Sequence, residues 1–143
     1  MPAPWLYIAT GEPHDNEMAA RIAEHRARRG AEWQTVEAPR DLAAALAAAP
    51  AGGSVLVDCL TLWLTNVMLA GADVDVEIAE LERALSERKT AVVLVANEVG
   101  LGIVPENALA RSFRDTAGRL NQRLAALADR VVLLVAGIPV KVK

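Results

Sequence analysis

A histidine near the start of the chain lies among arginines in a segment of good helix formers. The segment Asp15–Arg29 opens with capping and acidic residues, which predicts one helix. On such a helix His25 shares a face with three arginines one turn away, which are Arg21, Arg28 and Arg29. Like-charge repulsion would keep the imidazole neutral and nucleophilic, and the guanidinium groups would bind phosphate oxygens. The pattern predicts phosphate or nucleotide transfer through a covalent histidine intermediate, and a solvated basic face with an incidental histidine is the alternative.

A carboxylate ends the second apolar strand. Asp58 follows the run Val55-Leu56-Val57. At the carboxyl end of a parallel strand it is well placed to hold Mg²⁺ beside phosphates, directly or through water. The same side chain is equally suited to cap a helix that begins near Leu60. Both interpretations stay open on the sequence.

Polar side chains also follow the third apolar strand. Asn97 and Glu98 come directly after it, and the glycines of the next loop permit backbone conformations closed to other residues. We expect Asn97 to fix this loop or to contact ligand. Charged side chains on the polar side of the following helix are Arg111, Arg114, Asp115 and Arg119. Some of these are ordinary surface charges, and the others are candidates for substrate contacts.

The elements that must position these residues alternate along the chain. The predicted strands span 5–10, 33–37, 54–58, 90–96 and 130–136, the predicted helices 15–29, 40–49, 60–69, 75–89 and 106–129, and residues 139–143 are expected to form a polar tail. Continuous apolar strands separated by helices predict a mostly parallel sheet with helices on both faces. We therefore expect a single α/β domain over residues 1–143.

Composition narrows the classes of function. The formal net charge of -3 argues against nucleic acid as the main partner. The chain has one cysteine, which excludes an internal disulfide. No run approaches the roughly 18 apolar residues that span a membrane. We expect a cytoplasmic protein with no membrane partner.

The usual phosphate-binding glycine motifs are missing from this sequence. It contains neither a G-x-x-x-x-G-K-S/T loop nor a Rossmann glycine fingerprint. A parallel-sheet nucleotide enzyme with carboxylates for Mg²⁺ would be expected to have one of them.

Three long segments together carry a resemblance to a known family. They are YIATGEPHDNEMAARIAEHRARRGAEWQTVE at 7–37, VLVDCLTLWLTN at 55–66, and the block from NEVGLGIVPEN at 97 to the last residue. They closely resemble the bifunctional adenosylcobinamide kinase / adenosylcobinamide-phosphate guanylyltransferase family of cobalamin biosynthesis. The resemblance implies a P-loop-NTPase-like fold, phosphorylation of adenosylcobinamide with ATP or GTP, and transfer of GMP from GTP to adenosylcobinamide phosphate. It also implies Mg²⁺ and a homotrimer.

The resemblance assigns roles to particular residues. The family's GMP-histidine intermediate falls on His25. Its nucleotide contacts fall on Ala9, Thr10, Gly11, Arg26, Ala27, Arg28, Arg29, Glu37 and Asp58. Asp58 is the expected metal site, and the candidates for further substrate or metal contacts are Asn97, Glu98, Arg111 and Arg114.

The sequence departs from the family at its start. Family members begin with a strand, a GGARSGKS-like loop and a helix ahead of the segment that starts here at Trp5. We expect a form lacking the first strand, phosphate loop and first helix to be impaired as a kinase and to bind GTP more weakly. A start site upstream of Met1 is the explanation we favour. The alternative function is a non-catalytic remnant that binds nucleotide or corrinoid.

Overall fold

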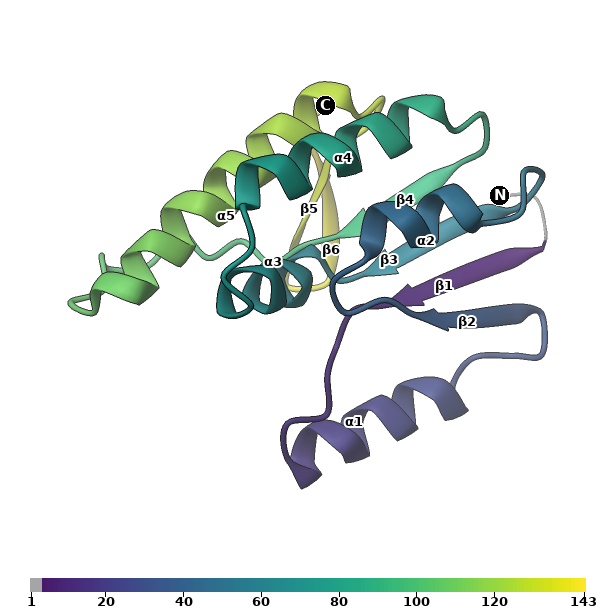
Figure 1. Ribbon diagram of the computed structural model, residues 1–143, viewed down its shortest axis with the longest axis horizontal. Coiled ribbons are helices and arrows are strands. Elements are labelled where there is room, and N and C mark those ends of the chain that lie inside the picture. Colours follow the sequence, from purple (N-terminus) through teal and green to yellow (C-terminus); the bar gives the residue numbers. More distant parts are fainter. Residues whose placement is uncertain (1–3) are drawn as a thin grey trace. The chain divides into compact units, whose positions relative to one another are not determined.

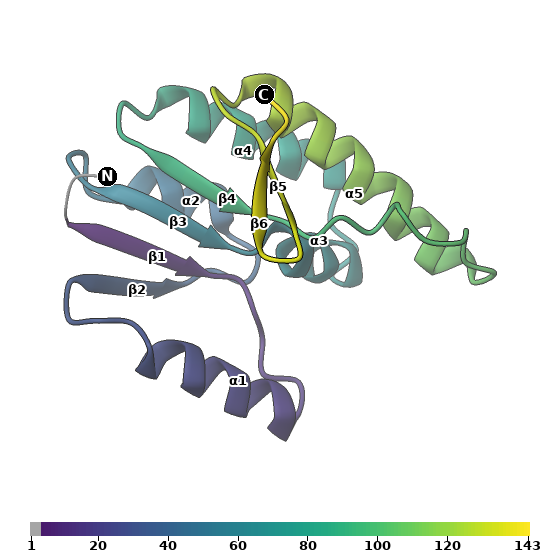
Figure 2. The same cartoon turned by 180° about the vertical axis from the view of Figure 1, so that it is seen from behind.

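The computed structural model describes residues 4–143, which fall into two compact units. The first unit reaches to Asn97, and the second runs from Glu98 to Lys143. Figures 1 and 2 show their elements from opposite sides. Each unit is described by itself below, and the expectation of a single domain over 1–143 stays a prediction.

The first unit is built on a four-stranded parallel sheet. Its strands are β1 (Trp5–Ala9), β2 (Trp33–Glu37), β3 (Ser54–Asp58) and β4 (Val92–Val95), in the order β2-β1-β3-β4. Every neighbouring pair is parallel. The predicted α/β class with a mostly parallel sheet flanked by helices is therefore confirmed. In Figures 1 and 2 the strands lie side by side with their carboxyl ends at one edge.

Four helices connect these strands. They are α1 (Asn16–Ala27), α2 (Leu42–Ala48), α3 (Leu60–Leu69) and α4 (Val74–Glu87). Three consecutive residues of β1 and three of the five residues of β3 are buried. Helices α2, α3 and α4 supply the large apolar side chains that complete the core, namely Leu42, Leu46, Trp63, Leu64, Ile78 and Leu81. By contrast, α1 has no buried residue and lies beyond the edge strand β2.

The predicted start of α1 is confirmed by its cap. The carboxylate of Asp15 accepts a hydrogen bond from the backbone N–H of Met18 at 2.7 Å. An N-cap side chain of this kind satisfies one of the donors that the first helical turn leaves free. The helix ends at Ala27, two residues earlier than the sequence pattern suggested.

Arg88 holds the end of α2 and the start of β3 together. Its guanidinium group donates to four backbone carbonyl oxygens, of Leu46, Ala49, Pro50 and Gly53, at 3.0–3.3 Å. It also donates to the hydroxyl of Thr90 at 2.7 Å. The sequence pattern placed this residue inside the helix predicted at 75–89. In the structure α4 ends at Glu87, and Arg88 turns back to bond carbonyl groups at the end of α2 and in the loop that follows it.

The second unit consists of a loop, a long helix and a hairpin. The helix α5 (Ala108–Leu127) begins at Asn107, whose side chain accepts from the N–H of Ala110 at 3.0 Å. The strands β5 (Val132–Val135) and β6 (Ile138–Lys141) form an antiparallel pair.

The hairpin corrects the prediction for the end of the chain. We expected residues 139–143 to form a tail after the last strand. Instead β6 pairs with β5 through the two-residue turn Ala136-Gly137, whose φ angles are 51° and 75°. Two consecutive positive φ angles suit the tight turn that reverses a strand directly. The glycine and the alternating residues after it were the signal that the sequence analysis missed.

Within residues 4–143, no helix is long and apolar enough to cross a membrane.

Candidate functional site

Three of the predicted nucleotide-binding residues form one row across the carboxyl edge of the sheet. Ala9, the last residue of β1, is in register with Glu37 on one side and with Asp58 on the other. Neighbours in register on parallel strands project from the same face of a sheet. The structure therefore brings together three residues that are up to 49 positions apart in the sequence. We call Ala9, Glu37 and Asp58 the carboxyl-edge row.

Asp58 is held by a tyrosine of the neighbouring strand. The hydroxyl of Tyr7 donates to Oδ2 of Asp58 at 2.5 Å. Burial raises the pKa of Tyr7, and the hydrogen bond to the Asp58 carboxylate and its negative charge raise this pKa further. The nearby Arg29 acts in the opposite direction. Tyr7 therefore keeps its proton and serves as a donor that orients the carboxylate.

The structure overturns the helix-cap interpretation of Asp58. The N-cap of α3 is Cys59, which makes no side-chain capping bond, and Asp58 is engaged with Tyr7 instead. The start of α3 is secured by Thr10, whose hydroxyl accepts from the Cys59 N–H at 2.8 Å and donates to the Cys59 carbonyl at 2.7 Å. The capping alternative is wrong because a cross-strand partner lies closer to the carboxylate.

Thr10 is fully buried and links the end of β1 to α3 through hydrogen bonds. Besides its two hydroxyl bonds, its backbone N–H donates to the carbonyl of Asp58 at 3.1 Å. Its own carbonyl accepts from the amide of Asn66 at 2.8 Å. With these groups engaged inside the protein, Thr10 positions the loop that leaves β1. Gly11, which follows it, is half-buried at the start of that loop.

His25 lies exposed in the last turn of α1, among side chains of both charges. Arg21 pairs with Glu17 at 2.9 Å, and Arg28 pairs with Glu24. The sequence pattern predicted arginines around His25. The glutamates one turn before Arg21 and Arg28 lie on the same side of the helix and were not included in that prediction.

Two arginines connect the end of α1 to the carboxyl edge of the sheet. Arg26 forms an ion pair with Glu37, a member of the carboxyl-edge row. The guanidinium of Arg29 stacks on the ring of Tyr7, with 3.6 Å between its Cζ and the ring centroid. Nε and Nη1 of Arg29 are buried and make no hydrogen bond. Guanidinium donors that have no partner inside the protein are suited to bind an anionic ligand. Ala27, which lies between these arginines, is exposed.

The remaining predicted residues follow β4. The backbone N–H of Asn97 donates to the hydroxyl of Thr61 at 2.8 Å, which fixes the exit of β4 beside α3. The expectation that Asn97 fixes the loop is met by its backbone, while its side chain is exposed.

Glu98, Arg111 and Arg114 belong to the second unit, where each makes a local contact. Glu98 accepts from the N–H of Gly100 at 2.7 Å. Arg111 donates to the carbonyl groups of Pro105 and Glu106, and Arg114 donates to the carbonyl of Gly100 at 3.3 Å. These bonds order the loop before α5, so the three residues have a structural role in the second unit. Their roles as substrate or metal contacts stay predictions.

Asp58 offers one carboxylate for a metal ion. Among residues 4–143, no group of three or more His, Cys, Asp or Glu side chains is arranged to hold one. A set of that kind is not required for Mg²⁺ in a nucleotide site, because the ion is commonly held by one or two carboxylates together with phosphate oxygens and water. Oδ1 of Asp58 makes no bond to Tyr7, and the chemistry of the site therefore fits Mg²⁺ brought with a nucleotide.

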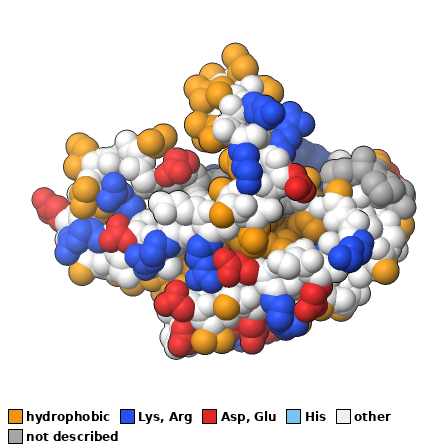
Figure 3. All heavy atoms as spheres, turned by 90° about the horizontal axis from the view of Figure 1, so that it is seen from above, with side chains coloured by type: hydrophobic (Ala, Val, Ile, Leu, Met, Phe, Trp, Pro, Cys, Tyr) orange, Lys and Arg blue, Asp and Glu red, His pale blue; other side chains and the backbone are white. Residues whose placement is uncertain are grey.

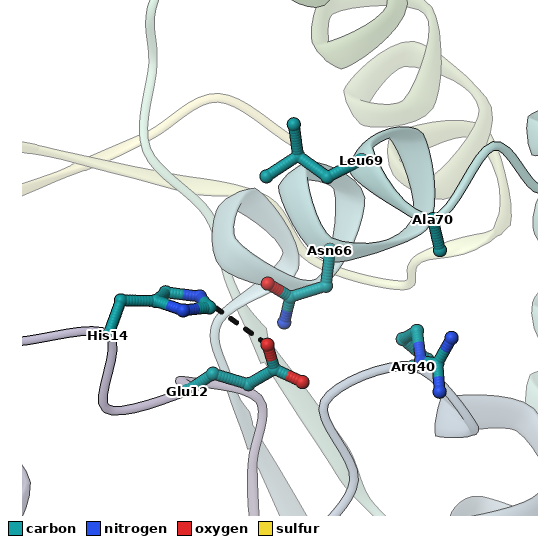
Figure 4. A pocket seen from close by; sticks show the side chains of 6 residues that line it. All are labelled: Glu12, His14, Arg40, Asn66, Leu69 and Ala70. Atoms are coloured by element: carbon teal, nitrogen blue, oxygen red, sulfur yellow. Dashed lines mark ion pairs between the residues drawn. The ribbon is translucent and has the colours of Figure 1, made fainter.

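Sequence reasoning missed a polar cavity at the same end of the sheet. It has a volume of about 230 Å³. Figure 4 shows the side chains that line it, from Glu12, His14, Arg40, Asn66, Leu69 and Ala70. The available signal was that Glu12 and Arg40 closely follow the first two strands.

The parallel sheet and the polar side chains gathered at its carboxyl edge define the class of protein. It is an α/β protein with a P-loop-like arrangement of strands and helices, in which ligand sites form at the carboxyl ends of the strands.

Comparison with known proteins identifies the family. The family described as cobinamide kinase / cobinamide phosphate guanyltransferase matches residues 1–142. The bifunctional adenosylcobalamin biosynthesis protein CobP of Pseudomonas aeruginosa is 49% identical over 140 residues, covering 96% of this chain and 81% of the relative. The CobU proteins of Salmonella typhimurium and Escherichia coli are 48% and 46% identical, covering 96% of this chain and 85% of each relative. The chain belongs to this family, and the resemblance found in the sequence is confirmed.

Proposed function

We propose that this chain transfers GMP from GTP to adenosylcobinamide phosphate through a guanylylated His25, giving adenosylcobinamide-GDP. Family membership supports the reaction class. The observation that carries the residue assignment is the connection from the helix of His25 to the carboxyl-edge row. Arg26 pairs with Glu37, and Arg29 stacks on the tyrosine that holds Asp58.

The proposed transfer divides one displacement into two. A ring nitrogen of His25 attacks the α-phosphorus of GTP, a P–N bond forms, and the bond to the β-phosphate oxygen breaks as pyrophosphate leaves. A phosphate oxygen of the corrinoid then attacks the same phosphorus. The P–N bond breaks, its electron pair returns to the ring, and a new P–O–P linkage forms. Protonation of the imidazole makes it the better leaving group in this second step.

The charges at the sheet edge suit this chemistry. The unpaired donors of Arg29 would stabilise the negative charge that develops on phosphoryl oxygens. Mg²⁺ held at Asp58 would supply further neutralisation of the phosphates. Tyr7 keeps the Asp58 carboxylate oriented through a hydrogen bond in which the Tyr7 hydroxyl is the donor. These assignments extend the coarser family function to named residues.

A labelling experiment tests the histidine intermediate. Protein incubated with α-labelled GTP and Mg²⁺ should retain an acid-labile label, and His25→Ala should retain none. Because the chain has two histidines, trypsin provides an internal control. Cleavage after Arg21 and Arg26 releases Ile-Ala-Glu-His-Arg, which contains His25, whereas His14 stays in the preceding peptide. Label in the preceding peptide, or no label on folded protein, would sink the assignment.

The kinase reaction in the family description is the second candidate function. We expect its phosphate donor to be ATP or GTP and its acceptor to be the hydroxyl of adenosylcobinamide. Transfer of label from γ-labelled nucleotide to the corrinoid would support it. Binding of adenosylcobinamide or GTP without either turnover would instead identify a non-catalytic binding protein.

A further inference from the structure

The cavity seen in Figure 4 lies outside the residues that the proposed transfer uses. Three segments of the first unit form it. Glu12 and His14 follow β1, and Arg40 follows β2. The other lining residues lie at the carboxyl end of α3, namely Asn66, Leu69 and Ala70. The cavity thus opens at the end of the sheet where ligands of this fold class bind.

Its polar groups include both acceptors and donors. The Nδ2 of Asn66 is occupied by the carbonyl groups of Thr10 and Pro39, at 2.8 and 3.0 Å. That arrangement fixes the side-chain amide and leaves Oδ1 as an acceptor. Glu12 is a second acceptor, with its Oε2 3.4 Å from Nε2 of His14.

Arg40 supplies the donors. Within residues 4–143 its guanidinium forms no hydrogen bond or ion pair. Its backbone is fixed, because the indole N–H of the buried Trp63 donates to the Arg40 carbonyl at 2.8 Å. The side chain therefore starts from a rigid point and presents free N–H groups at the cavity (Figure 4).

The charges select the chemical class of ligand. One carboxylate and one guanidinium balance each other, so a simple anion would meet Glu12 and a simple cation would meet Arg40. A neutral group with both donors and acceptors satisfies Glu12, Arg40 and Asn66, while His14 stays beside Glu12. A primary amide is such a group, with two N–H donors and one carbonyl acceptor.

We propose that this cavity binds a peripheral primary amide of the corrinoid substrate. The proposal rests on the proposed function, in which the acceptor is a cobinamide, a macrocycle that carries several such amides on its rim. Arg40 donates to the amide carbonyl, and Glu12 and Asn66 accept from its N–H groups. The apolar wall of Leu69 and Ala70 contacts the methylene carbons that carry the amide. The cavity thus binds the corrinoid substrate, while the carboxyl-edge row serves the nucleotide.

The edge of a guanine base presents a similar set of donors and acceptors. Binding measurements distinguish the corrinoid amide from guanine as the ligand of the cavity. Equilibrium dialysis of the whole chain measures adenosylcobinamide and GTP separately. Glu12→Gln and Arg40→Gln should each lower the affinity for adenosylcobinamide about ten-fold and leave the affinity for GTP within about two-fold of the wild-type value. Ala70→Leu, which fills the cavity without removing a polar group, should also lower the affinity for adenosylcobinamide. Matched controls are Glu87→Gln and Arg83→Gln, an exposed pair on α4 that should change neither affinity.

Three outcomes overturn the proposal. Loss of GTP affinity with unchanged corrinoid affinity would assign the cavity to guanine. Unchanged affinity for both ligands in all three cavity variants would leave the cavity without a ligand role, while the proposed function stands. A wild-type chain that binds no adenosylcobinamide would remove the substrate class itself, and the proposed function would fail with it.

Discussion

Tyr7 shows how one side chain links the parts of the candidate site. It donates to Asp58, carries Arg29 on its ring, and meets the edge of Trp33 at a ring-centroid distance of 6.2 Å. Each partner comes from a different element, namely β3, the residues after α1, and β2. Removing the hydroxyl alone would therefore disturb the carboxylate while leaving the aromatic packing in place.

Tyr7→Phe should lower the free energy of unfolding by about 1–3 kcal/mol at neutral pH, because a hydrogen bond to a charged acceptor is lost. Chemical denaturation of both proteins measures the difference. If the stabilities are equal, the bond to Asp58 contributes nothing in solution.

The raised pKa of Tyr7 also predicts a dependence on high pH. Below pH 10 the hydroxyl is protonated in both the folded and the unfolded chain, so its contribution is fully present. As pH rises above 10 the unfolded chain loses this proton first, and the contribution is lost as pH approaches the folded pKa. The free energy of unfolding should thus fall more steeply in the wild type than in Tyr7→Phe. Tyr7 is the only tyrosine, so tyrosinate absorbance reports its titration directly.

At the scale of elements, loops fixed by single side chains join the strands to the helices. Thr10 secures the start of α3, Thr61 holds the exit of β4, and Arg88 closes the end of α2. These contacts set where each chain segment leaves the sheet, and thus where the carboxyl-edge row and the cavity lie.

Arg88→Ala should destabilise the protein by about 2–4 kcal/mol, because backbone carbonyl oxygens lose their donors. Arg88→Lys should recover part of this loss only, since an ammonium group cannot reproduce the spread of guanidinium donors. Thermal unfolding measures both. Arg83→Ala, which breaks an exposed ion pair, is the control and should stay within about 0.5 kcal/mol. Equal effects at Arg83 and Arg88 would contradict the role given to Arg88.

At the scale of the whole molecule, the surface combines mixed charge with exposed apolar groups. On the face shown in Figure 3, acidic and basic side chains are interspersed and hydrophobic side chains lie between them. In the second unit Leu101 and Ile103 are 84% and 97% exposed, and Leu134 of β5 is 68% exposed. Exposed apolar surface of this kind is a common mark of an interface.

We expect the chain to assemble as a homotrimer, as the family resemblance implies. Sedimentation velocity should give three times the chain mass of 15.2 kDa. Raising the salt concentration should not dissociate an assembly held by apolar contacts. A mass of one chain across the concentration range would contradict this expectation.

The sequence predicted the strands and helices more completely than the contacts and pairing between them. The four parallel strands and the helices between them were found because apolar runs and capping residues are local signals. The contacts of Arg88 were not predicted, since its carbonyl partners lie 35 or more positions earlier in the chain. The final hairpin was missed because a parallel strand and a hairpin strand have the same apolar composition. For the site, local spacing found His25 and its arginines but left out the glutamates that pair with them.

By itself, the sequence determined the α/β class, the family and the identity of the residues proposed to carry the chemistry. Only the tertiary structure decided that Glu37, Ala9 and Asp58 form one row, that Tyr7 rather than a helix terminus holds Asp58, and that a cavity with balanced charges lies beside them. The physical reason is that strand register and side-chain contacts depend on segments far apart in the chain. Composition and periodicity describe each segment alone, and they do not contain the alignment of one segment with another.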